Sequence, residues 1–132
     1  MSQENVEIVR RAHELYRSGE WDAAIEECLD PGIEWETRWP GLPPVFHGHE
    51  GVREWALRAL EPMQIEMQLV EARAVGGETV FAAYRVHGQG RGSRVPTEMR
   101  IFDLLSVRSG RIYRRQTFYT EQEALKAVGL ED

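Results

Sequence analysis

The pattern of apolar and polar positions divides the chain into a helical first half and a strand-rich second half. Over residues 5–17, apolar side chains recur every three or four positions, which is typical of a helix that buries one face. The same pattern predicts shorter helices over 21–29 and 50–60. Between these, residues 33–39 alternate and indicate one early strand, although alternation does not tell which of its faces is buried.

The second half of the chain predicts an antiparallel meander. Alternating or β-branched stretches, separated by glycine-containing turns, indicate four strands over 63–75, 79–87, 96–108 and 111–119. A capping-box pattern at 120–123 predicts a last short helix that ends at Gly129. Because helices and strands are segregated, we expect one α+β domain over 1–132. Its cone-shaped, curved antiparallel sheet would pack against three N-terminal helices and enclose a pocket.

Composition narrows the classes of function. The net charge of −6 argues against binding of nucleic acid, which needs a basic surface. The apolar runs are too short to span a membrane, and the first residues lack the apolar stretch of a signal peptide. The single cysteine, Cys28, cannot form an internal disulfide and agrees with a reducing compartment. We therefore expect a cytoplasmic protein.

One carboxylate stands out in the strand-rich half. Asp103 has the same parity as Met99, Ile101 and Leu105, so it lies in the middle of an apolar face. Burial favours the protonated form of a carboxyl group, and such a group can act as a general acid or base near neutral pH. Asp103 is therefore a candidate catalytic residue. Two structural alternatives stay open: pairing with a buried arginine or tyrosine, and a bulge that turns the side chain outward.

His13 is the second candidate catalytic residue, because it borders the apolar stripe of the first helix. It could face the pocket as a base oriented by Asp103; the alternative is a histidine packed at the edge of the core. On the last strand Arg115 could pair with Asp103 or with a ligand carboxylate. The residues expected to line the pocket are Tyr16, Trp35, Thr37, Trp39, Trp55, Tyr84, Met99, Ile101, Leu105, Arg115, Thr117 and Tyr119.

Three stretches of the sequence carry a family resemblance. They are VEIVRRAHELYRSGEWDAAIEECLDPGIEW, FHGHEGVREW and RIFDLLSVRSGRIYRRQTFYTEQEALKAVGL. In this order they resemble the first two helices and first strand, the entry to the third helix, and the last hairpin and tail of SnoaL-like proteins in the nuclear transport factor 2-like superfamily. That superfamily includes ketosteroid isomerases, polyketide cyclases, limonene epoxide hydrolases, dehydratases and transport adaptors. The resemblance therefore implies the fold and a pocket but no single activity.

The resemblance places Asp103 where ketosteroid isomerases carry their oxyanion-hole aspartate. The first-helix tyrosine and the base of those enzymes fall on Ala12 and Thr37, and the last-strand aspartate of limonene epoxide hydrolases falls on Thr117. Two hypotheses remain: a cofactor-independent isomerase, cyclase or dehydratase that uses Asp103, and a non-catalytic module that binds a ligand or a protein. Under both we expect a small hydrophobic molecule as partner, no cofactor and no metal. Similar proteins usually pair through the outer face of the sheet, so we also expect a homodimer.

Overall fold

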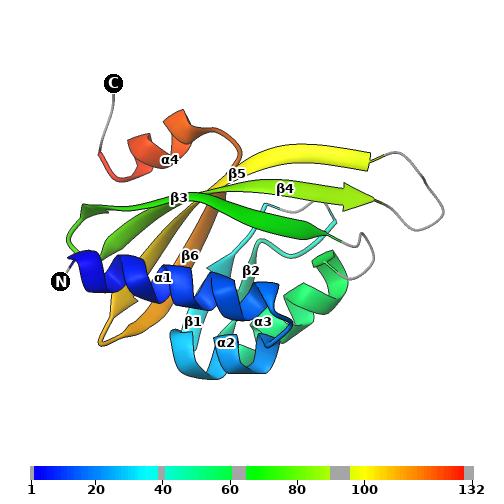
Figure 1. The fold of residues 1–132 in the computed structure, drawn as a ribbon, viewed down its shortest axis with the longest axis horizontal. Helices are drawn as coiled ribbons and strands as arrows, with labels where there is room; N and C mark the ends of the chain where they lie inside the picture. The colour runs from blue at the N-terminus through cyan, green and yellow to red at the C-terminus, as the bar shows by residue number, and fades with distance from the viewer. Residues whose placement is uncertain (1, 39–40, 61–64, 90–95, 130–132) are drawn as a thin grey trace.

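Six strands form one sheet that carries helices on both faces (Figure 1). The computed structural model describes residues 2–38, 41–60, 65–89 and 96–129. Its helices are α1 (Ser2–Arg17), α2 (Trp21–Cys28), α3 (Gly48–Trp55), the π-helical turn η1 (Ala56–Leu60) and α4 (Glu121–Ala127). Its strands are β1 (Leu29–Glu36), β2 (Val45–His47), β3 (Glu66–Gly76), β4 (Thr79–Gln89), β5 (Pro96–Arg108) and β6 (Arg111–Phe118), in the order β2-β1-β6-β5-β4-β3. The predicted α+β class is confirmed.

The sheet is mixed rather than wholly antiparallel, which corrects the prediction from sequence. Strands β3 to β6 form the expected antiparallel meander, and β2 pairs antiparallel with β1. Strand β1, however, runs parallel to β6, with Trp35 opposite Arg115. This pairing places two pocket candidates from distant parts of the sequence side by side.

The two faces of the sheet bury separate apolar clusters. The inner face packs against α1, α2 and α3 and contributes Ile101 and Leu105 to the main core (Figure 1). The outer face carries Phe81 and Phe102, which are covered by α4 through Leu125. Helix α4 therefore occupies part of the face through which we expect a homodimer, and the dimer stays a prediction.

Two local boundaries differ from those predicted. Helix α2 ends at Cys28, and the stretch Asp30-Pro31-Gly32 lies within β1 rather than in a turn. A register shift between Leu29 and Glu34 in the β1–β6 ladder accommodates it. The helix expected over 50–60 has two parts, because α3 begins at Gly48 and gives way to η1 at Ala56.

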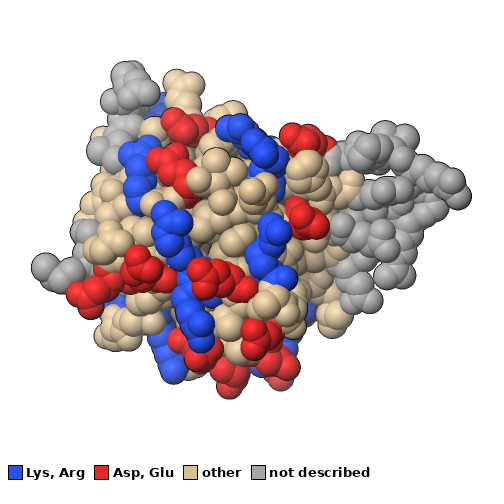
Figure 2. Space-filling model, viewed as in Figure 1, with Lys and Arg blue, Asp and Glu red and all other residues tan. Residues whose placement is uncertain are grey.

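Acidic and basic side chains are interspersed on the surface. Figure 2 shows both kinds mixed over the face it presents, and the described residues there form no broad basic area. Some pair across elements, such as Arg53 of α3 with Asp22 and Glu26 of α2. Among the described helices, none is long and apolar enough to cross a membrane.

Candidate functional site

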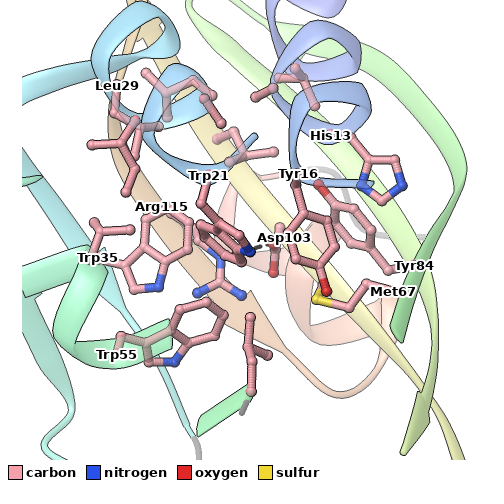
Figure 3. Close-up of a pocket in the computed structure, with 18 residues that line it drawn as sticks. His13, Tyr16, Trp21, Leu29, Trp35, Trp55, Met67, Tyr84, Asp103 and Arg115 are labelled. Atoms are coloured by element: carbon pink, nitrogen blue, oxygen red, sulfur yellow. Dashed lines mark hydrogen bonds and ion pairs between the residues drawn. The ribbon is translucent and has the colours of Figure 1, made fainter. Parts of the chain in front are cut away.

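A cavity of about 90 Å³ lies between the inner face of the sheet and the helices α1, α2 and α3 with η1. Most of its lining is aliphatic or aromatic. Figure 3 shows labelled side chains that approach Asp103 from two sides, with His13, Tyr16 and Tyr84 on one side and Trp35, Trp55 and Arg115 on the other. Apolar lining with a few convergent polar groups is the usual composition of a small-molecule site.

Asp103 lies in the β5 wall of the cavity, with both carboxylate oxygens in use. Arg115 Nε donates to Oδ2 at 2.9 Å, and Thr117 Oγ1 donates to Oδ1 at 2.8 Å. Both partners lie on β6, where Thr117 is directly opposite Asp103 in the ladder. The side chains of Asp103 and Arg115 are each 3% exposed, so the ion pair is shielded from water. Of the alternatives left open by the sequence, pairing with a buried arginine is the one observed.

The guanidinium of Arg115 lies against two indole rings. Its Cζ is 4.3 Å from the centre of the Trp35 ring and 4.9 Å from that of Trp55. Both contacts have the geometry of a cation–π interaction. Nη1 of Arg115 is buried and has no hydrogen-bond partner among the described residues. The ion pair therefore leaves one donor nitrogen of Arg115, Nη1, without a hydrogen-bond partner among the described residues.

His13 is tied to β3 rather than to Asp103. Its Nε2 accepts a hydrogen bond from the backbone N–H of Leu69 at 3.1 Å. Burial, helped by the positive charge of Arg17, lowers the pKa of His13 from an ordinary 6.5 to about 4. The imidazole is therefore neutral at neutral pH, with its proton on Nδ1 because Nε2 is the acceptor. No hydrogen bond or ion pair joins His13 to Asp103 in the described part of the chain.

Titration of His13 should make the fold less stable in mild acid. Because the pKa of this imidazole is lower in the folded than in the unfolded chain, the unfolded chain binds more protons between about pH 6.5 and 4. Its contribution to the free energy of unfolding is complete above pH 6.5 and is lost as the pH falls to about 4. We expect His13→Gln, which keeps an acceptor for Leu69 N–H, to flatten the pH dependence in this window.

Urea unfolding followed by circular dichroism at a series of pH values measures this effect. His87→Gln is the matched control, because the side chain of His87 is half-exposed and pairs with Glu98 at the surface. If the free energy of unfolding falls in acid by the same amount in His13→Gln and in the unmodified protein, the loss is not due to His13.

Tyr84 contributes a second polar group to the cavity wall. It lies on β4, two residues beyond Ala82, which is directly opposite Asp103 in the ladder. Burial raises the pKa of Tyr84, and the negative charge of Asp103 adds to this while Arg115 opposes it. Its hydroxyl makes no hydrogen bond to another described residue, whereas the Tyr16 hydroxyl donates to a backbone carbonyl oxygen. Tyr84 therefore presents a neutral O–H group at the cavity.

Metal ligands do not gather at this site. Over the ranges that the structure describes, no three His, Cys, Asp or Glu side chains lie close enough to hold a metal ion. His49 instead connects α3 to α2 and β1: its Nε2 is 2.9 Å from the carbonyl oxygen of Leu29, and its Nδ1 is 3.2 Å from the Glu26 carboxylate.

Eight of the residues predicted for the site line the cavity: Asp103, His13, Tyr16, Trp35, Trp55, Tyr84, Leu105 and Arg115. Trp39 lies outside the described residues. Five other predicted residues do not line it, which corrects the prediction. Ile101 and Met99 pack within or against the main core, and Thr117 uses its hydroxyl in the hydrogen bond described above. Thr37 and Tyr119 directly follow the last residues of β1 and β6 and do not line the cavity.

Sequence reasoning missed most of the helical side of the cavity, including Val9, Ala12, Trp21, Ala24 and Ile25. Their helical spacing identifies them as buried. Spacing cannot separate a side chain that fills the core from one that faces an open space, because both are apolar. Only the packing of several elements together decides which positions border a void.

A bulge in the last hairpin explains why Ile112 was not predicted to line the cavity. In the β5–β6 ladder Val107 pairs with Ile112, whereas Ser106 pairs with Arg114. Tyr113 is therefore the extra residue on β6, and strict alternation fails at this point. Ile112 points inward and lines the cavity, while the hydroxyl of Tyr113 donates to the Glu78 carboxylate on the outside.

Helices that pack on one face of a curved sheet around a small apolar cavity define a pocket-bearing α+β protein of the nuclear transport factor 2-like class. The sequence profile of the SnoaL-like domain matches residues 9–115. The chain belongs to this SnoaL-like family, which confirms the resemblance noted in the sequence. No curated protein matches the chain.

Solved structures share the fold at low sequence identity. TerC, co-crystallised with polyporic acid, aligns with a TM-score of 0.77 and 14% identity over 96% of this chain and 97% of its own. A protein of unknown function with a cystatin-like fold, from Xanthomonas campestris, aligns with a TM-score of 0.76 and 17% identity over 100% of both chains. A protein with a ketosteroid isomerase-like fold from Catenulispora acidiphila, in complex with trimethylamine, gives a TM-score of 0.72 and 20% identity over 94% of this chain and 93% of its own. Identities this low establish the fold alone.

Proposed function

We propose that this protein binds a small, mostly apolar molecule in the cavity beside Asp103 and Arg115. The observation that carries the proposal is the use of both Asp103 oxygens by Arg115 and Thr117 within an otherwise apolar, aromatic wall. A carboxylate fixed in this way orients a neighbouring cation, whereas a general base needs an oxygen within reach of a substrate proton.

The alternative is a cofactor-independent isomerase, cyclase or dehydratase that uses Asp103 and His13 as acid and base. Asp103 is engaged by two donors, and the lone pair of His13 Nε2 is engaged by the N–H of Leu69. Neither group stands ready to exchange a proton with a bound molecule in this geometry, so binding is better supported than catalysis. TerC and the Catenulispora acidiphila protein were crystallised with small molecules, which agrees with a binding pocket in proteins of this fold.

Filling the cavity should abolish ligand binding and leave the fold intact. Ala12 of α1 lines the cavity, so Ala12→Leu places an isobutyl group in a space of about 90 Å³. We expect small neutral probes such as toluene and cyclohexanone to shift backbone amide resonances of β4 and β5 in the unmodified protein and to leave those of Ala12→Leu unchanged. Two-dimensional NMR titration measures this directly.

Ala127→Leu is the matched control, because it makes the same change at an exposed position of α4, on the opposite face of the sheet. It should bind the probes as the unmodified protein does. Two results would count against a binding cavity: no shift with any probe up to its solubility limit, or equal shifts in Ala12→Leu.

A further inference from the structure

The next inference rests on the proposed binding function and defines what the ligand must carry. We propose that the cavity selects molecules with a neutral carbonyl oxygen, which accepts a hydrogen bond from Arg115 Nη1, and that Asp103 makes the cavity exclude carboxylates. Asp103 is in this view a specificity-determining residue that acts through Arg115.

The donor at Arg115 is the first part of the case. Its side chain is 3% exposed, and Nη1 has no hydrogen-bond partner among the described residues although Nε is paired with Asp103. A buried donor without a partner is destabilising, and a ligand that supplies an acceptor removes this cost. The two indole rings against the guanidinium fix its plane, so the direction of the free N–H is preset.

Other hydrogen-bond donors near Arg115 also lack a partner in the described part of the chain and favour a ligand that carries an acceptor. The Tyr84 hydroxyl is on the same face of the sheet as Asp103 and is not hydrogen-bonded to any described residue. Nε1 of Trp35 is buried and likewise lacks a hydrogen-bond partner among the residues described. Arg115 of β6 and Tyr84 of β4 therefore both present a donor group at the cavity. The carboxylate of Asp103 already has an internal partner for each oxygen.

The charge of the Asp103–Arg115 pair determines which kind of acceptor group on a ligand can bind at Nη1. Asp103 and Arg115 together carry no net charge, and both are shielded from water. A carboxylate bound at Nη1 would leave one negative charge uncompensated in an apolar space, which costs several kcal/mol in proteins. A neutral carbonyl oxygen accepts the same hydrogen bond and adds no charge. The ion pair thus favours a ketone, ester or amide over an acid of the same shape.

The size of the space limits the part of the ligand that enters it. Ligand pockets usually measure roughly 300–1,000 Å³, so a cavity of about 90 Å³ accepts only a small head group. A neighbouring groove of about 560 Å³ shares Tyr16, Trp21, Ile25 and Leu60 with the cavity lining. The groove and the cavity therefore lie on either side of the same side chains.

Three probes of similar shape separate the contribution of the hydrogen bond from that of the ligand's charge. Acetophenone carries a neutral carbonyl, α-methylstyrene replaces its oxygen with carbon, and benzoate replaces its methyl group with a charged oxygen. We expect acetophenone to bind the unmodified protein about tenfold more tightly than α-methylstyrene, since one hydrogen bond contributes about that factor. Benzoate should bind more weakly than either. NMR or calorimetric titration of the full chain provides the dissociation constants.

Asp103→Asn removes the negative charge but keeps the shape and an acceptor for Arg115. It should raise benzoate affinity at least tenfold and change acetophenone affinity by less than about threefold, because one positive charge is then uncompensated. Glu36→Gln is the matched control, since Glu36 pairs with Arg114 at the surface and the same chemical change there should alter neither affinity. Arg115→Met should abolish the preference for acetophenone over α-methylstyrene.

The possible failures are distinguishable. If no probe binds, the proposed binding function fails as well. If all three bind equally, or benzoate binds best to the unmodified protein, the selection by Asp103 and Arg115 is wrong while the binding function stands. If Asp103→Asn does not fold, the ranking of the three probes on the unmodified protein decides alone.

Discussion

Replacing Asp103 with alanine should destabilise the fold by about 3–5 kcal/mol, because it leaves a buried charge without its counter-ion. The guanidinium of Arg115 is 3% exposed and cannot reach water to recover its solvation. The hydroxyl of Thr117 loses its acceptor at the same time. Equilibrium urea unfolding measured by circular dichroism, with tryptophan fluorescence as a second probe, provides the free energy of unfolding.

Removing both partners should cost much less than removing one. In Asp103→Leu/Arg115→Met the charges are replaced by apolar groups of similar size, and such a change in a buried ion pair is often neutral. Glu78→Ala is the surface control, since the solvent-exposed Glu78–Arg108 pair should contribute little to stability. A loss for Asp103→Ala as small as that of Glu78→Ala would show that the buried pair does not carry the expected energy.

Phe81→Ala should cost about 3–5 kcal/mol of stability while leaving ligand affinity unchanged. Phe81 is fully buried on the outer face of the sheet, beneath α4 and against Phe102. Its removal leaves a void under α4, so amide hydrogens of 121–127 should exchange faster with solvent. The cavity lies on the opposite, inner face of the sheet, so Phe81→Ala removes none of the side chains that line it. Chemical unfolding, hydrogen exchange and probe titration report the three quantities.

Leu105→Ala is the comparison on the inner face. Leu105 is 4% exposed and lines the cavity, so its truncation should cost about 2–5 kcal/mol and also enlarge the binding space. Its probe affinities should change, in contrast to those of Phe81→Ala. Equal changes in affinity for the two variants would show that the outer and inner faces are not energetically separate.

Alternation along β5 was enough to place Asp103 on the inner face from sequence. Ile101 and Leu105 flank it at the same parity and are buried in the main core. Strand β1 also alternates between a buried and an exposed face, and the structure shows which is which. Ile33 is fully buried, whereas Glu34 is exposed and Glu36 pairs with Arg114. Period-two patterns are reliable where one face of a strand meets an apolar core.

The features that escaped prediction depend on contacts between distant segments. No local pattern marks the parallel pairing of β1 with β6, because the same residues would suit an antiparallel neighbour equally well. The bulge at Tyr113 places Ile112 on the inner face and Tyr113 on the outer face, the reverse of strict alternation. No glycine or proline within β6 marks this bulge in the sequence. The partner of Asp103 could be proposed but not chosen from sequence, since Arg115 had two plausible partners until its geometry was known.

The parallel pairing of β1 with β6 has a consequence for synthesis of the protein. Trp35 and Arg115 face each other across this pair, so the wall of the cavity cannot form until the last strand has left the ribosome. Until then the apolar stripes of α1 and α2 have only an incomplete sheet to cover them. Closing so long a stretch of chain is slow for entropic reasons. The nascent protein must therefore avoid aggregation until β6 has been made, before it can bind a ligand in the cavity.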